Sequence, residues 1–289
     1  MATDLCQNNL MSGNLLAPAV VFIIVFLLPA PLTCGAGPPL LKWRHLSSTQ
    51  GDLPAPNSGG QQTASLVLDV DRDGRPEIFV AERTAAPALV MYRFREGKWT
   101  LHIIEDQPLR IEAGSTHADI DGDGDEDVVF GGDGGSNQVW WWENPFPFFD
   151  STVAWRRHLI KASGANKHHD QLFGDFDGDS APELVFWNQQ AGSLFLAEIP
   201  ENPRGSGPWD LQEVYHYNID SEMLQTGQAG YPDWKSVNEH EGLARADINL
   251  DGIEDVVGGG RWFEYLAPGR FAEHIVDASY PFSRAAAGQ

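Results

Sequence analysis

The sequence predicts an all-β fold of repeated four-stranded sheets, and three observations carry this prediction. An acidic motif occurs four times, and each copy runs into an apolar segment, as residues 119–127 run into 128–130. Aromatic segments recur between the copies, among them Trp140-Trp141-Trp142, whose side chains should alternate between the two faces of a strand. The units between copies divide into short strand patterns, with no helical periodicity among them.

The spacing of the acidic motifs gives the architecture. The copies begin at Asp69, Asp119, Asp175 and Asp247, so they are 50, 56 and 72 residues apart. Each unit contains an inner strand, the acidic loop, an apolar strand, an aromatic strand and an outer strand. Four-stranded units at this period predict the blades of a β-propeller. Residues 282–289 have the pattern of a further inner strand, so we expect four blades plus the start of a fifth, as part of a larger ring.

The chain divides into three predicted segments. Residues 1–36 have the apolar run and the small residues of a signal peptide, although no Lys or Arg precedes the apolar run. Residues 37–60 are expected to form a linker and, around Trp43, an outer strand that closes the ring. Residues 61–289 are expected to form the blades. We therefore expect a secreted or extracytoplasmic protein, with an uncleaved membrane anchor as the alternative for the first segment.

The charge and the cysteines narrow the function classes. A net charge of -22 excludes a nucleic-acid-binding surface and argues against binding to anionic membranes. The two cysteines, Cys6 and Cys34, precede the predicted blades, so no disulfide is expected within them. Metal ions bound to the acidic loops would then stabilise a secreted fold in place of disulfides.

The acidic motif has the ligand spacing of a calcium loop. Calcium loops of the EF-hand type take oxygens from positions 1, 3, 5, 7 (a main-chain carbonyl) and 9, with glycine at position 6. Phe130 replaces the glutamate of position 12, and no helices flank the motif, so we expect a calcium loop between strands. The predicted ligands are Asp69, Asp71, Asp73, Arg75 and Glu77 (loop 1); Asp119, Asp121, Asp123, Asp125 and Asp127 (loop 2); Asp175, Asp177, Asp179, Ala181 and Glu183 (loop 3); and Asp247, Asn249, Asp251, Ile253 and Asp255 (loop 4).

These loops resemble the FG-GAP/VCBS repeat family, the calcium-loop propellers also seen in integrin α-chains. The resemblance covers residues 61 to 276, and its signature is clearest in Phe173-Gly174-Asp175 and in 129–132. It implies a propeller that binds calcium at several sites. Ser180 replaces the turn glycine of loop 3, and Asn249 replaces an aspartate of loop 4. Counting ligands, we expect loop 2 to bind calcium most tightly and loops 3 and 4 to be the weaker pair.

A second candidate site lies at the mouth of the predicted channel. The residues seven before each loop are Gln62, Glu112, His168 and His240, and inner strands of a propeller begin around one mouth of the channel. Imidazole and carboxylate groups there could hold a transition metal such as Zn²⁺ or transfer protons, or they could simply line a wet channel. The candidate catalytic or metal-ligating residues are His168, His169, His240 and Glu241, and the candidate ligand-binding residues are Glu112, His117, Tyr231 and Trp234.

Three functions fit these patterns. The favoured one is a secreted calcium-binding module for a carbohydrate or an extracellular protein, because Tyr and Trp rings beside carboxylates suit sugars. The second is a metal-dependent sugar dehydratase, a carbon–oxygen lyase, because residues 140–145 and 241–247 have a looser likeness to the propeller part of aldos-2-ulose dehydratase. The third is an adhesion ectodomain. The sequence contains no nucleophile elbow, phosphate loop, dinucleotide fingerprint or zinc helix.

Overall fold

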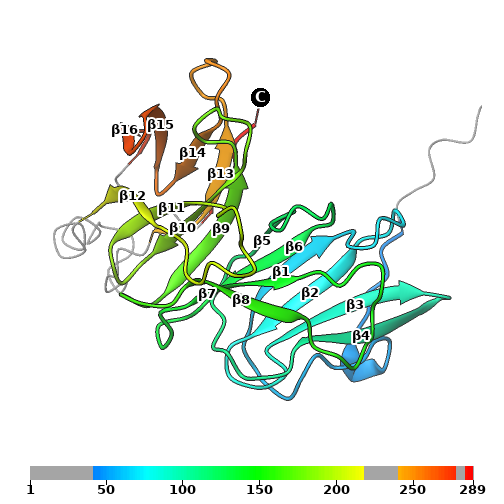
Figure 1. Ribbon diagram of the computed structural model, residues 1–289. Helices are drawn as coiled ribbons and strands as arrows, with labels where there is room; N and C mark the ends of the chain where they lie inside the picture. Colours follow the sequence, from blue (N-terminus) through cyan, green and yellow to red (C-terminus); the bar gives the residue numbers. More distant parts are fainter. Residues whose placement is uncertain (1–41, 218–239, 278–283, 289) are drawn as a thin grey trace, which may run out of the picture. The chain divides into compact units, whose positions relative to one another are not determined.

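A computed structural model describes residues 42–217, 240–277 and 284–288, and these residues form an all-β structure. Their sixteen strands make four antiparallel sheets of four strands each (Figure 1). The chain divides into two compact units, residues 1–45 and 46–289, and every strand that the structure describes lies in the second. The predicted signal peptide and the residues Tyr231 and Trp234 lie outside the described residues.

Each sheet is one predicted unit, and we call the sheets blades 1 to 4. In every blade the strands pair in chain order, and the acidic loop joins the first strand to the second. The strands are β1 (Gln62–Leu68), β2 (Glu77–Glu82), β3 (Leu89–Arg95) and β4 (Lys98–Glu105) in blade 1; β5 (Thr116–Ala118), β6 (Asp127–Gly131), β7 (Val139–Glu143) and β8 (Arg156–Lys161) in blade 2; β9 (His168–Gly174), β10 (Glu183–Asn188), β11 (Ser193–Glu198) and β12 (Gln212–His216) in blade 3; and β13 (Leu243–Ala246), β14 (Asp255–Gly258), β15 (Arg261–Ala267) and β16 (Arg270–Ile275) in blade 4.

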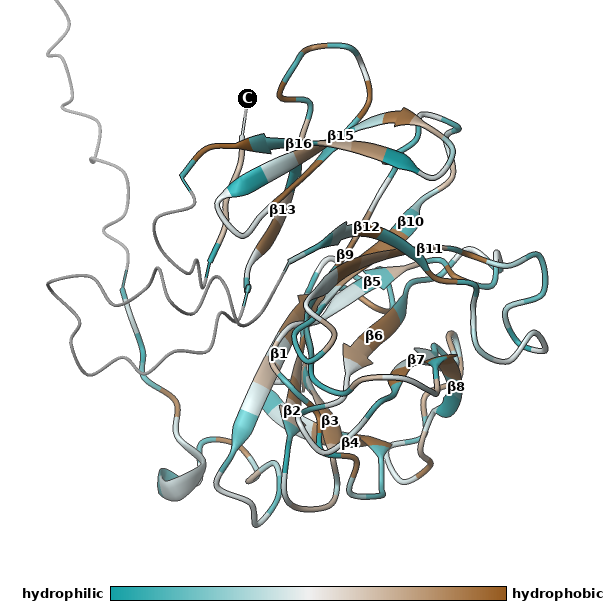
Figure 2. Cartoon of the chain, turned by 90° about the vertical axis from the view of Figure 1, so that its left-hand side faces the viewer, coloured by the Kyte–Doolittle hydropathy of each residue, from teal (hydrophilic) through white to brown (hydrophobic). Residues whose placement is uncertain are grey.

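Three hydrophobic clusters pack consecutive blades face to face. One joins blades 1 and 2, the next joins blades 2 and 3, and the last joins blades 3 and 4. The predicted alternation of the tryptophan run is confirmed, because Trp140 and Trp142 belong to the first cluster and Trp141 to the second. The second strands β6 and β10 are apolar along most of their length (Figure 2), since both of their faces are covered.

In three of the four acidic loops, the second residue packs into this core. Val70 is buried in the cluster between blades 1 and 2, Ile120 in the next cluster, and Phe176 in the last. Ile248 holds the same place in blade 4 but is 43% exposed, and no further sheet covers it in the part of the chain that the structure describes. Loops 1 to 3 are therefore anchored by apolar packing as well as by their polar groups.

Two expectations at the ends of the chain need correction. Residues 42–47 form no strand, and Trp43 is 93% exposed. Blade 4 supplies its own fourth strand, β16, so no described sheet lacks an outer strand for residues 41–46 to complete. Residues 284–288 are not a strand either, although they run beside β13, where a Cβ atom on Gly242 would lie 2.5 Å from the nitrogen of Ala285. The four sheets do not close into a ring.

Among the described residues, no helix has the length and apolar character needed to cross a membrane.

Trp141 provides a test of this packing. Its ring is fully buried between blades 2 and 3 and stacks on His158 at 4.2 Å. Trp141→Ala should lower the free energy of unfolding by about 3–5 kcal/mol, because it leaves a large cavity between two sheets. Phe148→Ala is the control, since Phe148 belongs to the same blade and is 84% exposed. Urea denaturation measures both, and equal effects of the two substitutions would contradict the stacked-blade core.

Candidate functional site

The four acidic loops share one set of hydrogen bonds, which fixes their shape. The N–H of the second residue donates to the carboxylate of the ninth: Val70 to Glu77 (3.2 Å), Ile120 to Asp127 (3.0 Å), Phe176 to Glu183 (2.7 Å) and Ile248 to Asp255 (2.7 Å). The N–H of the sixth residue donates to the first aspartate: Gly74 to Asp69 (2.8 Å), Gly124 to Asp119 (3.0 Å), Ser180 to Asp175 (3.1 Å) and Gly252 to Asp247 (3.0 Å). The carboxylates of positions 1 and 9 are therefore held in place by the loop backbone itself.

The turn in each loop needs two residues with positive φ. At the sixth position Ser180 has a φ of 75°, where the other loops have glycine, and this conformation costs a serine about 1 kcal/mol. At the fourth position Arg72 and Leu250 also have positive φ, as do Gly122 and Gly178. The positive φ of the fourth position was not predicted, although Gly122 and Gly178 were a signal for it in the sequence.

Loop 3 gathers the largest group of carboxylates. One oxygen from each of Asp175, Asp177, Asp179 and Glu183 lies within 4.8 Å of the others. None of these four residues forms an ion pair with any residue that the structure describes. Glu183 is fully buried, and its Oε1 atom has no hydrogen-bond partner. Burial, together with the charges of Glu198 and the loop aspartates, raises the pKa of Glu183 to about 8.

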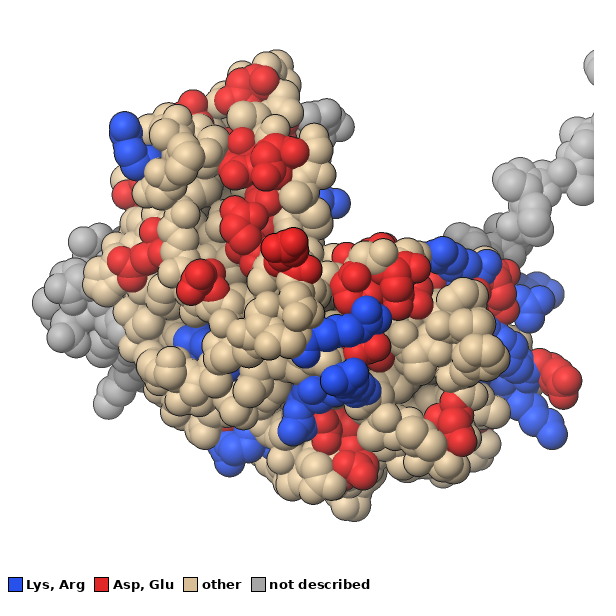
Figure 3. All heavy atoms as spheres, viewed as in Figure 1, with Lys and Arg blue, Asp and Glu red and all other residues tan. Residues whose placement is uncertain are grey.

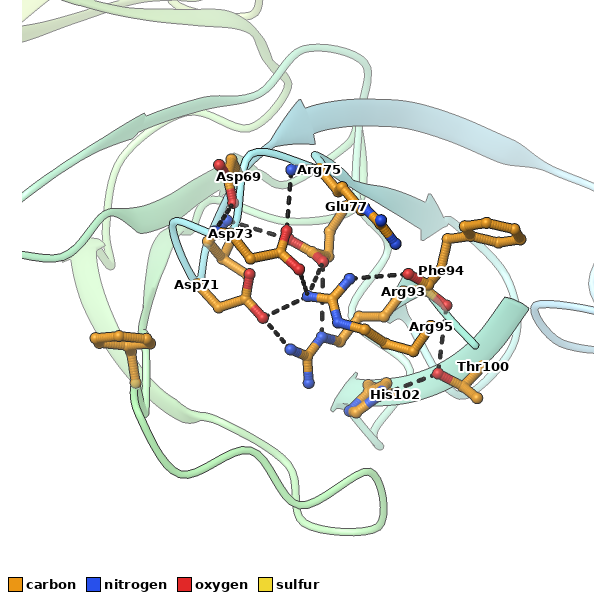
Figure 4. A network of polar contacts seen from close by, with 12 residues as sticks. Asp69, Asp71, Asp73, Arg75, Glu77, Arg93, Phe94, Arg95, Thr100 and His102 are labelled. Atoms are coloured by element: carbon orange, nitrogen blue, oxygen red, sulfur yellow. Dashed lines mark hydrogen bonds and ion pairs between the residues drawn. The ribbon is translucent and has the colours of Figure 1, made fainter. Parts of the chain in front are cut away.

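Loop 1 differs, because two arginines of β3 lie among its carboxylates (Figure 4). Nη2 of Arg95 is 2.5 Å from Asp71, 3.0 Å from Asp73 and 3.2 Å from Glu77. Arg93 also pairs with Asp71, and its Nε atom lies 3.6 Å from Glu77. Burial opposes ionisation of Asp71, but the two guanidinium groups outweigh it and hold the pKa of that carboxyl below its ordinary value.

Loop 2 receives an arginine from the neighbouring blade. Arg204, in the connection between β11 and β12, lies 2.5 Å from Asp121 and 3.2 Å from Asp123 through Nη2. Its side chain is 38% exposed, so it reaches the loop from the surface. Burial and the neighbouring aspartates still raise the pKa of Asp125 to about 7, and burial above all raises that of Asp127 to about 8.

Loop 4 contains an amide in place of a carboxylate. The Asn249 side chain donates to Asp251 (3.0 Å) and to Glu264 of β15 (3.2 Å). Three of the four loops, but not loop 4, have at least three carboxylate oxygens within 4.8 Å of one another in the described part of the chain. Acidic side chains gather in patches on the face of the molecule seen in Figure 3, with Lys and Arg beside part of them.

The starts of the inner strands meet at a polar cluster. His169 lies between two carboxylates, because its Nδ1 forms a hydrogen bond with Asp170 at 2.8 Å and its Nε2 lies 3.3 Å from Glu241. Asp170 also accepts the N–H of Gly242 at 2.6 Å, which links blades 3 and 4. Burial opposes protonation of His169, yet Asp170, and then Glu241 and Glu112, raise its pKa above the ordinary value.

A cavity of about 300 Å³ opens beside this cluster. In each blade, the residue five positions before the acidic loop lines the wall of this cavity. The lining residues are 63–65, 113–115, Asp170, Gly242, Leu243, Arg284 and Ala285. The inner strands and the C-terminal segment therefore converge on one cavity, as their register indicates.

The two other candidate histidines do not join this cluster. His168 is fully buried between blades 2 and 3, where Nδ1 lies 3.1 Å from the carbonyl of Gly132. His240 is buried between blades 3 and 4, with its ring 5.0 Å from that of Trp187. His168 and His240 hold the same position in consecutive blades, so each lies in a different interface between blades. The predicted set of His168, His169, His240 and Glu241 is therefore not assembled as one site.

The candidate ligand-binding residues Glu112 and His117 lie elsewhere. Glu112 pairs with Arg83 of blade 1 and acts on His169 only through its charge. His117 pairs with Glu126 at 2.9 Å on the surface of blade 2. Among the described residues, the groups with metal-ligand spacing consist of loop carboxylates and contain no histidine.

The pKa values of the two adjacent histidines should be shifted in opposite directions. Burial and the charge of Lys161 lower the pKa of His168 to about 3, so its neutral form stabilises the fold above about pH 6.5, and this stability is lost as the pH falls toward 3. His169 has a raised pKa, so its contribution is full below about pH 6.5 and is lost as the pH rises through the folded value. NMR titration, with His168→Gln and His169→Gln to assign the signals, measures both. Equal pKa values would contradict the two environments.

Part of the chain, including loops 2 and 3, is similar to a known repeat. The FG-GAP-like repeat matches residues 119–186, which run from the first aspartate of loop 2 into β10 and include loop 3. No curated protein shows significant similarity to the chain, and the likeness to aldos-2-ulose dehydratase gains no support. Loops 1 and 4 repeat the hydrogen bonds of the matched pair. Residues 119–186 of the chain therefore match an FG-GAP-like repeat.

Proposed function

We propose that this protein is a secreted, calcium-binding propeller module that binds a carbohydrate or an extracellular protein. The observation that carries the calcium part is loop 3, where four carboxylates converge without a positively charged partner among the described residues. The predicted export segment of residues 1–36 and the family of the repeat support secretion.

The chemistry of loop 3 fits a hard divalent cation. Two unit charges about 4.8 Å apart repel by roughly 3.5 kcal/mol at an effective dielectric constant of about 20. Calcium takes six to eight oxygen ligands and accepts both carboxylates and main-chain carbonyls. Asp175, Asp177, Asp179 and Glu183 would hold the ion, with the main-chain oxygen of Ala181 as the predicted fifth ligand. The free Oε1 atom of Glu183 would gain the partner that it lacks.

A binding function is favoured over catalysis because the four candidate catalytic residues do not lie together in one site. Of its four residues, only His169 and Glu241 lie in contact, at 3.3 Å, while His168 and His240 are enclosed in separate blade interfaces. The adhesion alternative depends on the N-terminal segment, which lies outside the described residues. A glycan array probed with the calcium-loaded chain tests the carbohydrate arm, and failure of all glycans would leave an extracellular protein as the partner.

Calcium should raise the melting temperature. One occupied site stabilises the fold by roughly 2.7 kcal/mol at a hundredfold excess over its Kd, which corresponds to roughly 5–10 °C for a chain of this size. Asp177→Asn should remove the part of this shift that belongs to loop 3. Asp150→Asn is the matched control, because Asp150 is exposed and bonds only locally to Thr152. Identical melting curves with calcium and with a chelator would refute calcium binding.

A further inference from the structure

One position on the third strand of each blade lies next to the acidic loop. In all four blades the residue that follows the ninth loop position pairs with the third strand, as Leu184 pairs with Ala197 and Val128 with Trp142. The next third-strand residue toward the loop is then opposite the ninth position itself. These residues are Arg93, Glu143, Glu198 and Glu264 in blades 1 to 4.

The residue at this position interacts with its loop. Arg93 pairs with Asp71 of loop 1, and Glu264 accepts a hydrogen bond from Asn249 of loop 4. Glu143 binds Arg204, the same guanidinium that contacts Asp121 of loop 2. Glu198 pairs in register with Glu183, the buried carboxylate of loop 3. Three blades therefore add a carboxylate beside the loop, and blade 1 adds a cation.

The buried carboxylate of the ninth position shows the effect of this difference. Glu77 and Glu183 are both fully buried, and in each case one oxygen accepts the N–H of the second loop residue. The other oxygen of Glu77 accepts a hydrogen bond from Arg95 at 3.2 Å. The other oxygen of Glu183 has no partner. The same place is thus filled by a guanidinium in blade 1 and is left for a cation in blade 3.

We propose that the third-strand residue decides which loops take a divalent cation: Arg93, with Arg95, makes loop 1 a calcium-independent loop, whereas Glu198 is an additional anionic residue that completes a calcium site in loop 3. This inference rests on the proposed calcium binding. Although Asp69, Asp71 and Glu77 have metal-ligand spacing, the two guanidinium groups already supply the two positive charges that a calcium ion would bring. Calcium entering loop 1 would break these ion pairs and meet two cations at close range.

Amide hydrogen exchange of the unmodified chain, with calcium or with a chelator, tests this assignment directly. Residues 175–183 should exchange at least tenfold more slowly with calcium, while residues 69–77 should exchange equally in both conditions. Equal protection of both loops would overturn the inference and leave the calcium proposal intact. No protection of any loop would overturn both.

Two variants test the role of the third-strand position. Arg93→Glu combined with Arg95→Gln should give loop 1 a calcium-dependent protection and should add one calcium ion per chain in equilibrium dialysis. Glu198→Arg should abolish the protection of residues 175–183. Glu201→Arg is the control, because Glu201 is exposed on the connection just after β11 and should leave loop 3 unchanged. Unchanged calcium stoichiometry in folded Arg93→Glu/Arg95→Gln would contradict the proposal.

Discussion

Repulsion among carboxylates is the constraint on which each blade depends. The loop backbone holds these groups together through its own N–H donors, so the negative charges cannot move apart without breaking the turn. The four loops differ in how this repulsion is reduced. Two arginines of β3 neutralise loop 1, and Arg204 pairs with loop 2. An amide replaces a carboxylate in loop 4, and no described side chain neutralises loop 3. The same loop backbone thus carries a different arrangement of charges in each blade.

The charge of a loop is coupled to the core of the protein. The second loop residue is part of the packing between blades, and its N–H binds the carboxylate of the ninth position. In loop 3, Phe176 therefore connects the buried Glu183 to the cluster between blades 3 and 4. A cation that relieves the repulsion in the loop would also stabilise the interface between the sheets, because both depend on the same backbone turn.

The sequence predicted the blades well because their signals are local and repeated. The strand pattern and the loop register follow from the repeated unit, and the alternation of Trp140 to Trp142 follows from the two-residue period of a strand. The arginines were not predicted, because Arg95 and Arg204 reach their carboxylates only through strand pairing and blade packing. The number of carboxylates in each loop therefore predicted the tightest calcium binding in loop 2, whereas the charges in the structure favour calcium binding in loop 3. Register likewise placed His168 and His240 at one level, but it could not show that each enters a different interface.

A tethered guanidinium and a bound calcium ion are therefore two alternative ways to neutralise the same kind of carboxylate cluster. Anomalous diffraction from crystals grown with calcium shows which of the two each loop uses. The expected result is an anomalous peak among Asp175, Asp177, Asp179 and Glu183, and none among Asp69, Asp71 and Glu77, where Arg93 and Arg95 should remain in place. A peak in loop 1 with both arginines displaced would contradict it, as would an ordered loop 3 without any ion.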